Sequence, residues 1–144
     1  RKVLTDFSEK WKKKFKRTIP ILDTFMTEDA YTIIVVYGPN SGNAMLAVNE
    51  LRQKGEKVGL VRIHLFRPWP QLDIEMSLKT AKKVAVVDNQ VSIGAWSALY
   101  PQIKSSTSAA CSNFIFDKVV SVKEFIDIYN RIKSSEKEER IWMV

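Results

Sequence analysis

Short apolar runs alternate with segments of helical periodicity along most of the chain. Four runs rich in β-branched and aromatic residues predict strands at 31–37, 58–66, 83–88 and 113–117. The first (YTIIVVY) is apolar on both faces, which is typical of a strand that helices cover on each side. Because strands and helices alternate, we expect an open three-layer α/β/α sandwich with a mostly parallel sheet of about five strands and right-handed crossovers.

Helical periodicity places helices at 42–54, 72–81, 95–105 and from residue 121 onwards. Gly55 follows the first of these, where a left-handed cap suits glycine. Pro101 should bend or split the third. Ser121 and Glu124 have the spacing of a capping box, so the last helix should begin there.

Length and composition indicate one ordinary domain. Of 144 residues, 45% are hydrophobic, which can fill a core of that size. Cys111 is the single cysteine, so no internal disulfide can form. The sequence has neither a secretory leader nor an apolar stretch of the roughly 18 residues that a membrane helix needs, and we expect a soluble, cytoplasmic protein. Because the chain begins with Arg1, we expect a fragment or a processed piece.

Positive charge is concentrated at the amino terminus. The net charge is +7, and residues 1–17 (RKVLTDFSEKWKKKFKR) hold eight Lys or Arg against two acidic residues. Apolar residues recur there at helical spacing and predict an amphipathic helix: Val3, Leu4, Phe7, Trp11 and Phe15. We expect its apolar face to dock on protein, with Trp11 and Phe15 as interface candidates. Binding to a phosphate backbone or an acidic membrane is the alternative.

Three regions follow from these patterns. Residues 1–30 are expected to form the basic helix and a linker around Pro20. Residues 31–134 should form the α/β domain. Residues 135–144 should form a charged tail. The SSEKEER stretch at 134–140 is expected to be a solvated helix end or tail.

Loops after the strands are the places to search for a ligand, because ligands of such sheets meet the carboxyl ends of the strands. The candidates are Gly38, Ser41, Asp88, Asn89 and Ser92. The turn GPNSG lacks the third glycine of a dinucleotide fingerprint and the Lys-Ser/Thr of a nucleotide-triphosphate loop, which favours a plain tight turn. Asp and Asn are also common at strand ends because they bond to nearby backbone.

Candidate chemistry is sparse. Ser92, His64 and Asp88 could be considered as a hydrolytic triad, but Ser92 lacks the flanking glycines of a nucleophile elbow. One histidine and one cysteine cannot supply the four ligands of a structural zinc ion or an iron–sulfur cluster. We therefore predict no catalytic, cofactor-binding or metal-binding residue in this chain.

The second strand ends in an unusual corner, Arg67-Pro-Trp-Pro70. Each proline fixes its own φ and biases the preceding residue toward an extended shape. We expect this rigid corner to aim Arg67 and Trp69 outward. Both residue types are preferred anchors of protein interfaces, so we interpret Arg67 and Trp69 as contacts to a neighbouring domain, with simple core closure as the alternative.

The ordered set of motifs resembles one family. A helix ends in Leu-Arg-x-x-Gly (51–55), and a strand begins with Lys-Val-Gly-Leu (57–60). The Arg-Pro-aromatic-Pro corner (67–70), Lys-Lys-Val-Ala-Val-x-Asp (82–88) and Ser-x-Gly (92–94) follow in that order. This series is similar to the transketolase carboxyl-terminal-like domain of 2-oxoacid:ferredoxin oxidoreductases, alpha-subunit type, and most similar to the pyruvate branch. The chain departs from the family at Asn89, where a basic residue is usual, and at Ser97, where glycine is frequent.

The resemblance implies a noncatalytic assembly domain of a complex that oxidatively decarboxylates a 2-oxoacid to an acyl-coenzyme A. It implies thiamine diphosphate, magnesium, iron–sulfur clusters and coenzyme A in that complex, none bound by this chain alone. Implied partners are the other domains or subunits, and ferredoxin at the level of the complex. We expect no membrane partner, disfavour nucleic acid and leave a dimer open. The alternative function is a free-standing module whose basic helix binds nucleic acid or another polyanion.

Overall fold

The centre of the molecule is a six-stranded sheet with the spatial order β1-β3-β2-β4-β7-β8. This computed structural model describes residues 2–143. The strands of the sheet are β1 (Leu22–Phe25), β2 (Thr32–Tyr37), β3 (Val58–Ile63), β4 (Lys83–Asp88), β7 (Ala110–Phe116) and β8 (Arg140–Met143). A small hairpin consists of β5 (Val91–Ser92) and β6 (Trp96–Ser97).

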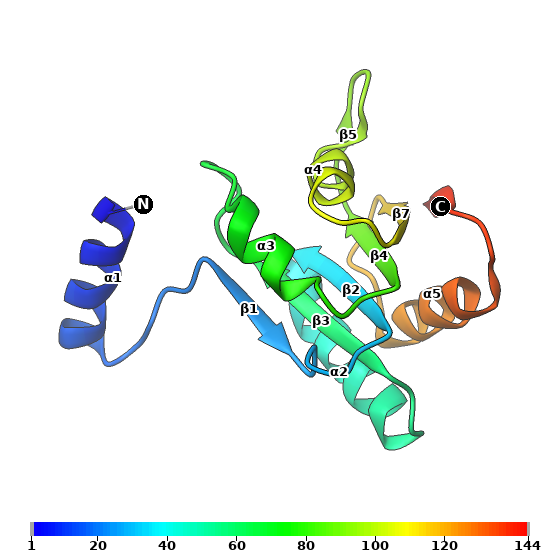
Figure 1. Cartoon of the computed structure of the whole chain (residues 1–144), viewed down its shortest axis with the longest axis horizontal. Coiled ribbons are helices and arrows are strands. Elements are labelled where there is room, and N and C mark those ends of the chain that lie inside the picture. The colour runs from blue at the N-terminus through cyan, green and yellow to red at the C-terminus, as the bar shows by residue number, and fades with distance from the viewer. Residues whose placement is uncertain (1, 144) are drawn as a thin grey trace.

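Helices precede, connect and follow the strands (Figure 1). They are α1 (Lys2–Phe15), α2 (Ser41–Gln53), α3 (Gln71–Ser77), α4 (Tyr100–Ser105) and α5 (Val122–Ser134). All strand pairs of the large sheet are parallel except β1 with β3, which confirms the predicted mostly parallel sheet. The carboxyl ends of the parallel strands therefore meet at one edge.

Two apolar cores lie on opposite faces of the sheet and confirm the three layers. Ile34 and Val36 of β2 join the core that α2 and α5 cover. Ile33 and Val35 join the core that α3 and α4 cover. Successive side chains of a strand point to opposite faces, so an apolar run such as TIIVVY serves both cores. In Figure 1 the sheet separates the two helix pairs.

One glycine in β3 is required by packing. A Cβ atom on Gly59 would lie 2.7 Å from the carbonyl oxygen of Met26, which no real Cβ atom tolerates. The chain leaving β1 crosses β3 at this point. Glycine thus permits the close approach that brings the antiparallel edge strand onto the sheet.

The sheet has a strand at each edge that was not predicted. β1 lies in the expected linker, and β8 lies in the expected charged tail, where it pairs with β7. The expectation of a charged tail was wrong for residues 140–143, which form this strand. Both strands have four residues and sit at an edge, so neither shows the two-sided apolar run of a central strand. The sheet thus extends past the expected domain limits at residues 31 and 134.

Several element ends also differ from the prediction. The expected helix at 95–105 begins only at Tyr100, with β6 before it. Pro101 neither bends nor splits it, because proline in the first turn of a helix removes no intrahelical hydrogen bond. β3 ends at Ile63, α3 ends at Ser77, and β7 begins earlier, at Ala110. Within residues 2–143, no helix is both long enough and apolar enough to cross a membrane.

Candidate functional site

A tight turn leads from β2 into α2. It begins at Gly38, whose φ of +69° suits glycine. Ser41 is buried, and its hydroxyl donates a hydrogen bond to the carbonyl oxygen of Gly38 at 2.7 Å. Pro39 offers no amide N–H here. The turn thus uses the Ser41 hydroxyl internally, and a ligand-binding role for Gly38 and Ser41 stays a prediction.

Two asparagines connect the three loops after β2, β4 and β7. The amide of Asn40, which is 1% exposed, donates to Oδ1 of Asn89. Asn40 Oδ1 accepts from the backbone N–H of Val120 at 2.9 Å. Asn89 Nδ2 donates to the carbonyl oxygens of Phe116 at 3.1 Å and Lys118 at 2.7 Å. We call these side chains and their partners the asparagine bridge. Sequence reasoning considered Asn89 as a ligand contact and missed Asn40.

Asp88 closes the loop that follows β4. Its fully buried carboxylate accepts hydrogen bonds from the backbone N–H groups of Gln90, at 3.1 Å, and Leu99, at 2.8 Å. Burial, together with the negative charge and a hydrogen bond of Asp88, raises the pKa of Tyr37 to about 12. Tyr37 therefore stays protonated at neutral pH and can act as a hydrogen-bond donor. The loop geometry depends on Asp88, whose role toward a ligand stays a prediction.

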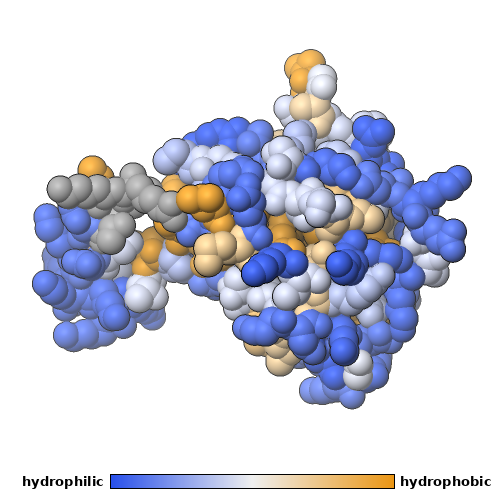
Figure 2. Space-filling model, in the orientation of Figure 1, coloured by the Kyte–Doolittle hydropathy of each residue, from blue (hydrophilic) through white to orange (hydrophobic). Residues whose placement is uncertain are grey.

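Ser92 lies in the β5–β6 hairpin, beside an open hollow of about 630 Å³. The hollow also includes Trp96, Tyr100, Arg140 and Trp142, so it joins the hairpin to edge strand β8. Trp96 has φ +66°, a conformation that is uncommon for an aromatic residue. Figure 2 shows the hydrophobic tip of the hairpin projecting from the body of the molecule. The lining is mainly apolar, which suits a protein contact better than a reaction.

The proline corner holds its two candidate side chains differently. The exposed guanidinium of Arg67 lies 4.2 Å from the ring centroid of Phe66 and donates to its carbonyl oxygen. Trp69 is half-buried, and its indole N–H donates to Gln71 Oε1 at 3.0 Å and Ser106 Oγ at 3.3 Å. The expectation that both side chains point outward is therefore corrected for Trp69, which packs against the core beside α3. The Arg67–Pro68 peptide bond is cis.

His64 contacts a different carboxylate from the one that a Ser92–His64–Asp88 triad would require. Its Nε2 lies 2.9 Å from Asp23 Oδ2, which also accepts hydrogen bonds from Arg62. Partial burial opposes ionisation of Asp23, but the bonds from Arg62 and His64 outweigh it and lower the pKa of the carboxyl. This cluster ties edge strand β1 to β3. Ser92 and Asp88 take no part in it.

Metal-binding groups are also lacking in the described part of the chain. Among residues 2–143, no group of three or more His, Cys, Asp or Glu side chains is placed to hold a metal ion. Cys111 is buried, and burial is the main reason why the pKa of its thiol rises to about 12. A protonated, enclosed thiol is a poor metal ligand.

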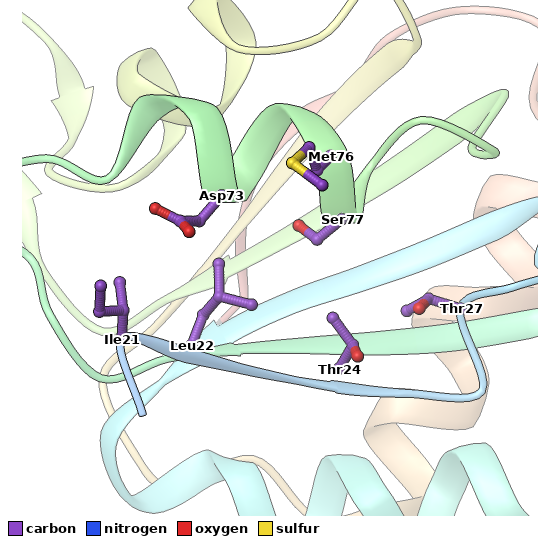
Figure 3. Close-up of a pocket in the computed structure, with 7 residues that line it drawn as sticks. All are labelled: Ile21, Leu22, Thr24, Thr27, Asp73, Met76 and Ser77. Carbon is purple, nitrogen blue, oxygen red and sulfur yellow. The ribbon is translucent and has the colours of Figure 1, made fainter. Parts of the chain in front are cut away.

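A furrow runs between β1 and α3 (Figure 3). One hollow of about 480 Å³ lies between these elements, and a second of about 350 Å³ continues it along the proline corner. The two share Ile21 and Asp73. We call this surface the β1–α3 furrow; its apolar lining is Ile21, Leu22, Leu65, Trp69, Leu72 and Met76.

Helix α1 carries the predicted aromatic stripe. The ring centroids of Phe7 and Trp11 are 5.8 Å apart, and those of Trp11 and Phe15 are 4.2 Å apart. Phe7 and Phe15 are each nearly half exposed. Figure 1 shows α1 set apart from the layers of the domain. The stripe is thus formed and partly exposed, and the interface role of Trp11 and Phe15 stays a prediction.

Together these features define an α/β domain whose strand-end loops are bonded to one another and whose apolar surfaces lie at its flanks. Residues 30–124 match the model of the family described as pyruvate:ferredoxin oxidoreductase core domain II. The chain belongs to this family.

Relatives agree with the family and are much longer than this chain. The chain is 28% identical over 151 residues to pyruvate synthase subunit PorA of Methanocaldococcus jannaschii, covering 99% of this chain and 39% of the relative. It is 33% identical to PorA of Thermotoga maritima over 74% of this chain and 27% of the relative. A solved 2-oxoglutarate:ferredoxin oxidoreductase from Magnetococcus marinus shares the fold, with a TM-score of 0.64 and 20% identity over 85% of this chain and 21% of that chain. The chain thus spans about two fifths or less of these relatives.

Proposed function

We propose that the chain is a noncatalytic assembly domain of a 2-oxoacid:ferredoxin oxidoreductase, with pyruvate as the 2-oxoacid. The family match over residues 30–124 carries this proposal, and relatives named as pyruvate synthase subunits support pyruvate. The parent enzyme would convert pyruvate and coenzyme A to acetyl-coenzyme A and carbon dioxide, passing two electrons to ferredoxin. We place this reaction in the cytoplasm.

The geometry supports an assembly role because the polar groups at the strand ends are already engaged. The asparagine bridge and the Asp88 carboxylate bond mainly to backbone groups of neighbouring loops. A catalytic group must instead be free to reach a reacting atom. Exposed apolar side chains lie at α1, at the hairpin and on α3, where partner domains can cover them.

Thiamine diphosphate, magnesium, iron–sulfur clusters and coenzyme A would be held by other parts of the complex. The thiol of Cys111 is enclosed and protonated, which does not fit an iron–sulfur cluster. The Asp88 carboxylate is occupied by two backbone amides, which does not fit a magnesium ligand. We further propose that the assembly domain runs from β1 to β8, with α1 as a separate docking helix.

The proposal is tested by reconstitution. The purified chain alone should give no pyruvate-dependent reduction of ferredoxin. Co-expressed with a thiamine-binding and an iron–sulfur subunit of a pyruvate synthase, it should co-purify with them, and Arg67→Ala should lower the recovered complex while leaving the thermal midpoint of the chain unchanged. Lys123→Ala, an exposed cation on α5, is the matched control. Turnover by the lone polypeptide, or failure to associate with either subunit, would overturn the proposal.

A further inference from the structure

One edge of the sheet ends in a short strand that has no partner strand on its outer side. Among residues 2–143, β8 is the last strand in the sheet order and pairs with β7 alone. Figure 1 shows the red end of the ribbon, which includes β8, at the side of the molecule opposite α1. An open strand edge presents N–H and C=O groups to which another strand can bond. We propose that β8 pairs antiparallel with β8 of a second copy, so that the two sheets join into one across a two-fold axis.

Alternation along β8 determines which of its backbone groups face outward. The backbone N–H of Asn113 in β7 donates to the carbonyl oxygen of Glu139 at 2.8 Å, so this carbonyl faces β7. Successive residues of a strand direct their backbone groups to opposite edges. Ile141 therefore also faces β7, whereas Arg140 and Trp142 direct their N–H and C=O groups outward. Antiparallel pairing of Arg140 with Trp142 of the second copy, on both sides of the axis, would form about four backbone hydrogen bonds.

The side chains of β8 complement one another in this register. Arg140 and Trp142 lie on the face that carries the hollow beside the hairpin, and Ile141 packs against the core that α2 and α5 cover. When Ile141 lies opposite Ile141 of the other copy, each Arg140 lies opposite the other copy's Trp142, where its guanidinium can stack on the indole ring. Trp142 is 48% exposed, so indole surface remains for this contact. Centring the pair on Arg140 would instead set two arginines directly opposite one another, which is unfavourable.

A second copy is the occupant that this strand specifies, because one short sequence supplies both sides of every contact in a closed two-fold dimer. Arg140 and Trp142 line the open hollow of about 630 Å³ together with Trp96 and Tyr100. Because the other copy's Trp142 would lie opposite Arg140, it would add a further aromatic ring at the rim of this hollow. The contact is small, so we expect a weak dimer. It is a property of the chain itself and does not depend on the identity of the parent enzyme.

Substitutions in β8 test both the pairing and its register. By sedimentation equilibrium the native chain should form dimers between about 10 and about 500 μM. Trp142→Arg should weaken the dimer at least about tenfold, because arginines of the two copies would then lie opposite one another. Arg140→Glu alone should weaken it at least about threefold, since the cation over the indole ring is lost. Arg140→Glu combined with Trp142→Arg should recover the dimer, because only the proposed register sets these two positions of different copies opposite each other.

Tyr31→Arg is the matched control, because it also replaces an exposed aromatic ring by arginine, at a position before β2, and it should dimerise like the native chain. Hydrogen exchange of the native chain is a second measurement that needs no substitution. The amide protons of Arg140 and Trp142 should exchange about twofold or more slowly at about 500 μM than at about 10 μM, whereas that of Ile141 should change little.

Four results would each overturn the proposal. The first is a native chain that stays monomeric at about 500 μM. The others are a dimer that Trp142→Arg leaves intact, a doubly substituted chain that fails to recover the dimer, and exchange at Arg140 and Trp142 that does not depend on protein concentration.

Discussion

The strand-end loops and the flanks of this domain use their side chains in opposite ways. At the strand ends, buried amides and a buried carboxylate bond to neighbouring loops, as in the asparagine bridge and at Asp88. At the flanks, apolar side chains such as Ile93 of the hairpin and Met76 of α3 face solvent. Polar groups of the kind that bind ligands are used here to hold the fold together. Apolar groups of the kind that folding usually buries are exposed instead. This difference favours a docking domain over a catalytic one.

The comparison predicts different costs for changes in the two regions. A buried polar group that loses its partner costs about 1–3 kcal/mol, because it keeps its desolvation penalty. An exposed apolar side chain contributes little to folding, so its removal is nearly neutral for the isolated chain. Stability measurements and assembly measurements should therefore respond to different residues.

The largest expected effect is that of Asn40→Ala. The substitution leaves the Val120 N–H without its acceptor and Asn89 Oδ1 without its donor. We expect a loss of about 2–3 kcal/mol in the free energy of unfolding. Urea denaturation followed by circular dichroism measures it, with exposed Asn130→Ala on α5 as the control, which should change stability by under about 0.5 kcal/mol. Equal losses for both variants would show that the asparagine bridge does not contribute specifically to the free energy of unfolding.

The second effect concerns the start of α5, which follows directly on the loop that Asn40 holds. Ser121 accepts a hydrogen bond from the Glu124 backbone N–H, and the Glu124 carboxylate accepts from the Ser121 backbone N–H. Ser121→Ala should cost about 1 kcal/mol of unfolding free energy in the same denaturation experiment. Ser121→Asp, which can still cap the helix, should recover most of it; if it does not, capping is not the cause.

Glu124 makes the same helix start sensitive to acid. Hydrogen bonds from the backbone and side chain of Ser121, and then from Lys118, lower the pKa of Glu124 to about 2 from a model-peptide value of 4.5. The ionised carboxylate therefore stabilises the fold above about pH 4.5, and the contribution disappears as pH falls toward about 2. Since Glu124 remains partly accessible to solvent, which screens its interactions, we expect a contribution of under about 1 kcal/mol. Unfolding curves of the native chain and Glu124→Gln should differ at pH 7 and converge in acid. A constant difference would exclude this carboxylate as the cause.

The two regions also differ in how far the sequence could predict them. The capping box at Ser121 and Glu124 spans three residues, and it was predicted correctly because local spacing specifies it. Asn40 was missed because its partners Asn89 and Val120 are 49 and 80 residues away. Such contacts depend on which loops the sheet order brings together, and spacing along one sequence does not encode that order.

The remaining errors have related causes. Central strands β2 and β4 were predicted almost to the residue, since burial on both faces demands apolar side chains at every position. Edge strands β1 and β8 were missed because one side of each is open to solvent, which permits polar residues. Trp69 was expected to point outward because the two prolines make the corner rigid and because tryptophan is a preferred interface anchor. Its indole N–H is instead satisfied by Gln71 and by Ser106, which comes from beyond α4.

At the flanks, Ile93→Ser should separate assembly from stability. Ile93 is fully exposed in the hairpin, so its replacement should change the unfolding free energy by under about 0.5 kcal/mol. Recovery of the complex with pyruvate synthase subunits should nevertheless fall severalfold, because the interface would lose an aliphatic side chain that assembly buries. Val119→Ser, at another exposed position in the loop after β7, should leave recovery unchanged. If both variants assemble like the native chain, the hairpin is not an interface.

The smallest expected effect concerns the basic helix and the alternative of nucleic-acid binding. Outside residues 1–17 the chain has a net charge of only +1, so few phosphates could be neutralised beyond one face of α1. Nonspecific binding of this kind weakens steeply with salt, and we expect no detectable complex with duplex DNA or RNA at about 150 mM salt and about 10 μM protein. The triple substitution of Lys12, Lys13 and Lys14 by Gln should therefore change nothing in a fluorescence anisotropy titration at that salt. A complex that forms with the native chain and is lost in the triple variant would favour the polyanion-binding module instead, because these lysines would then bind phosphate.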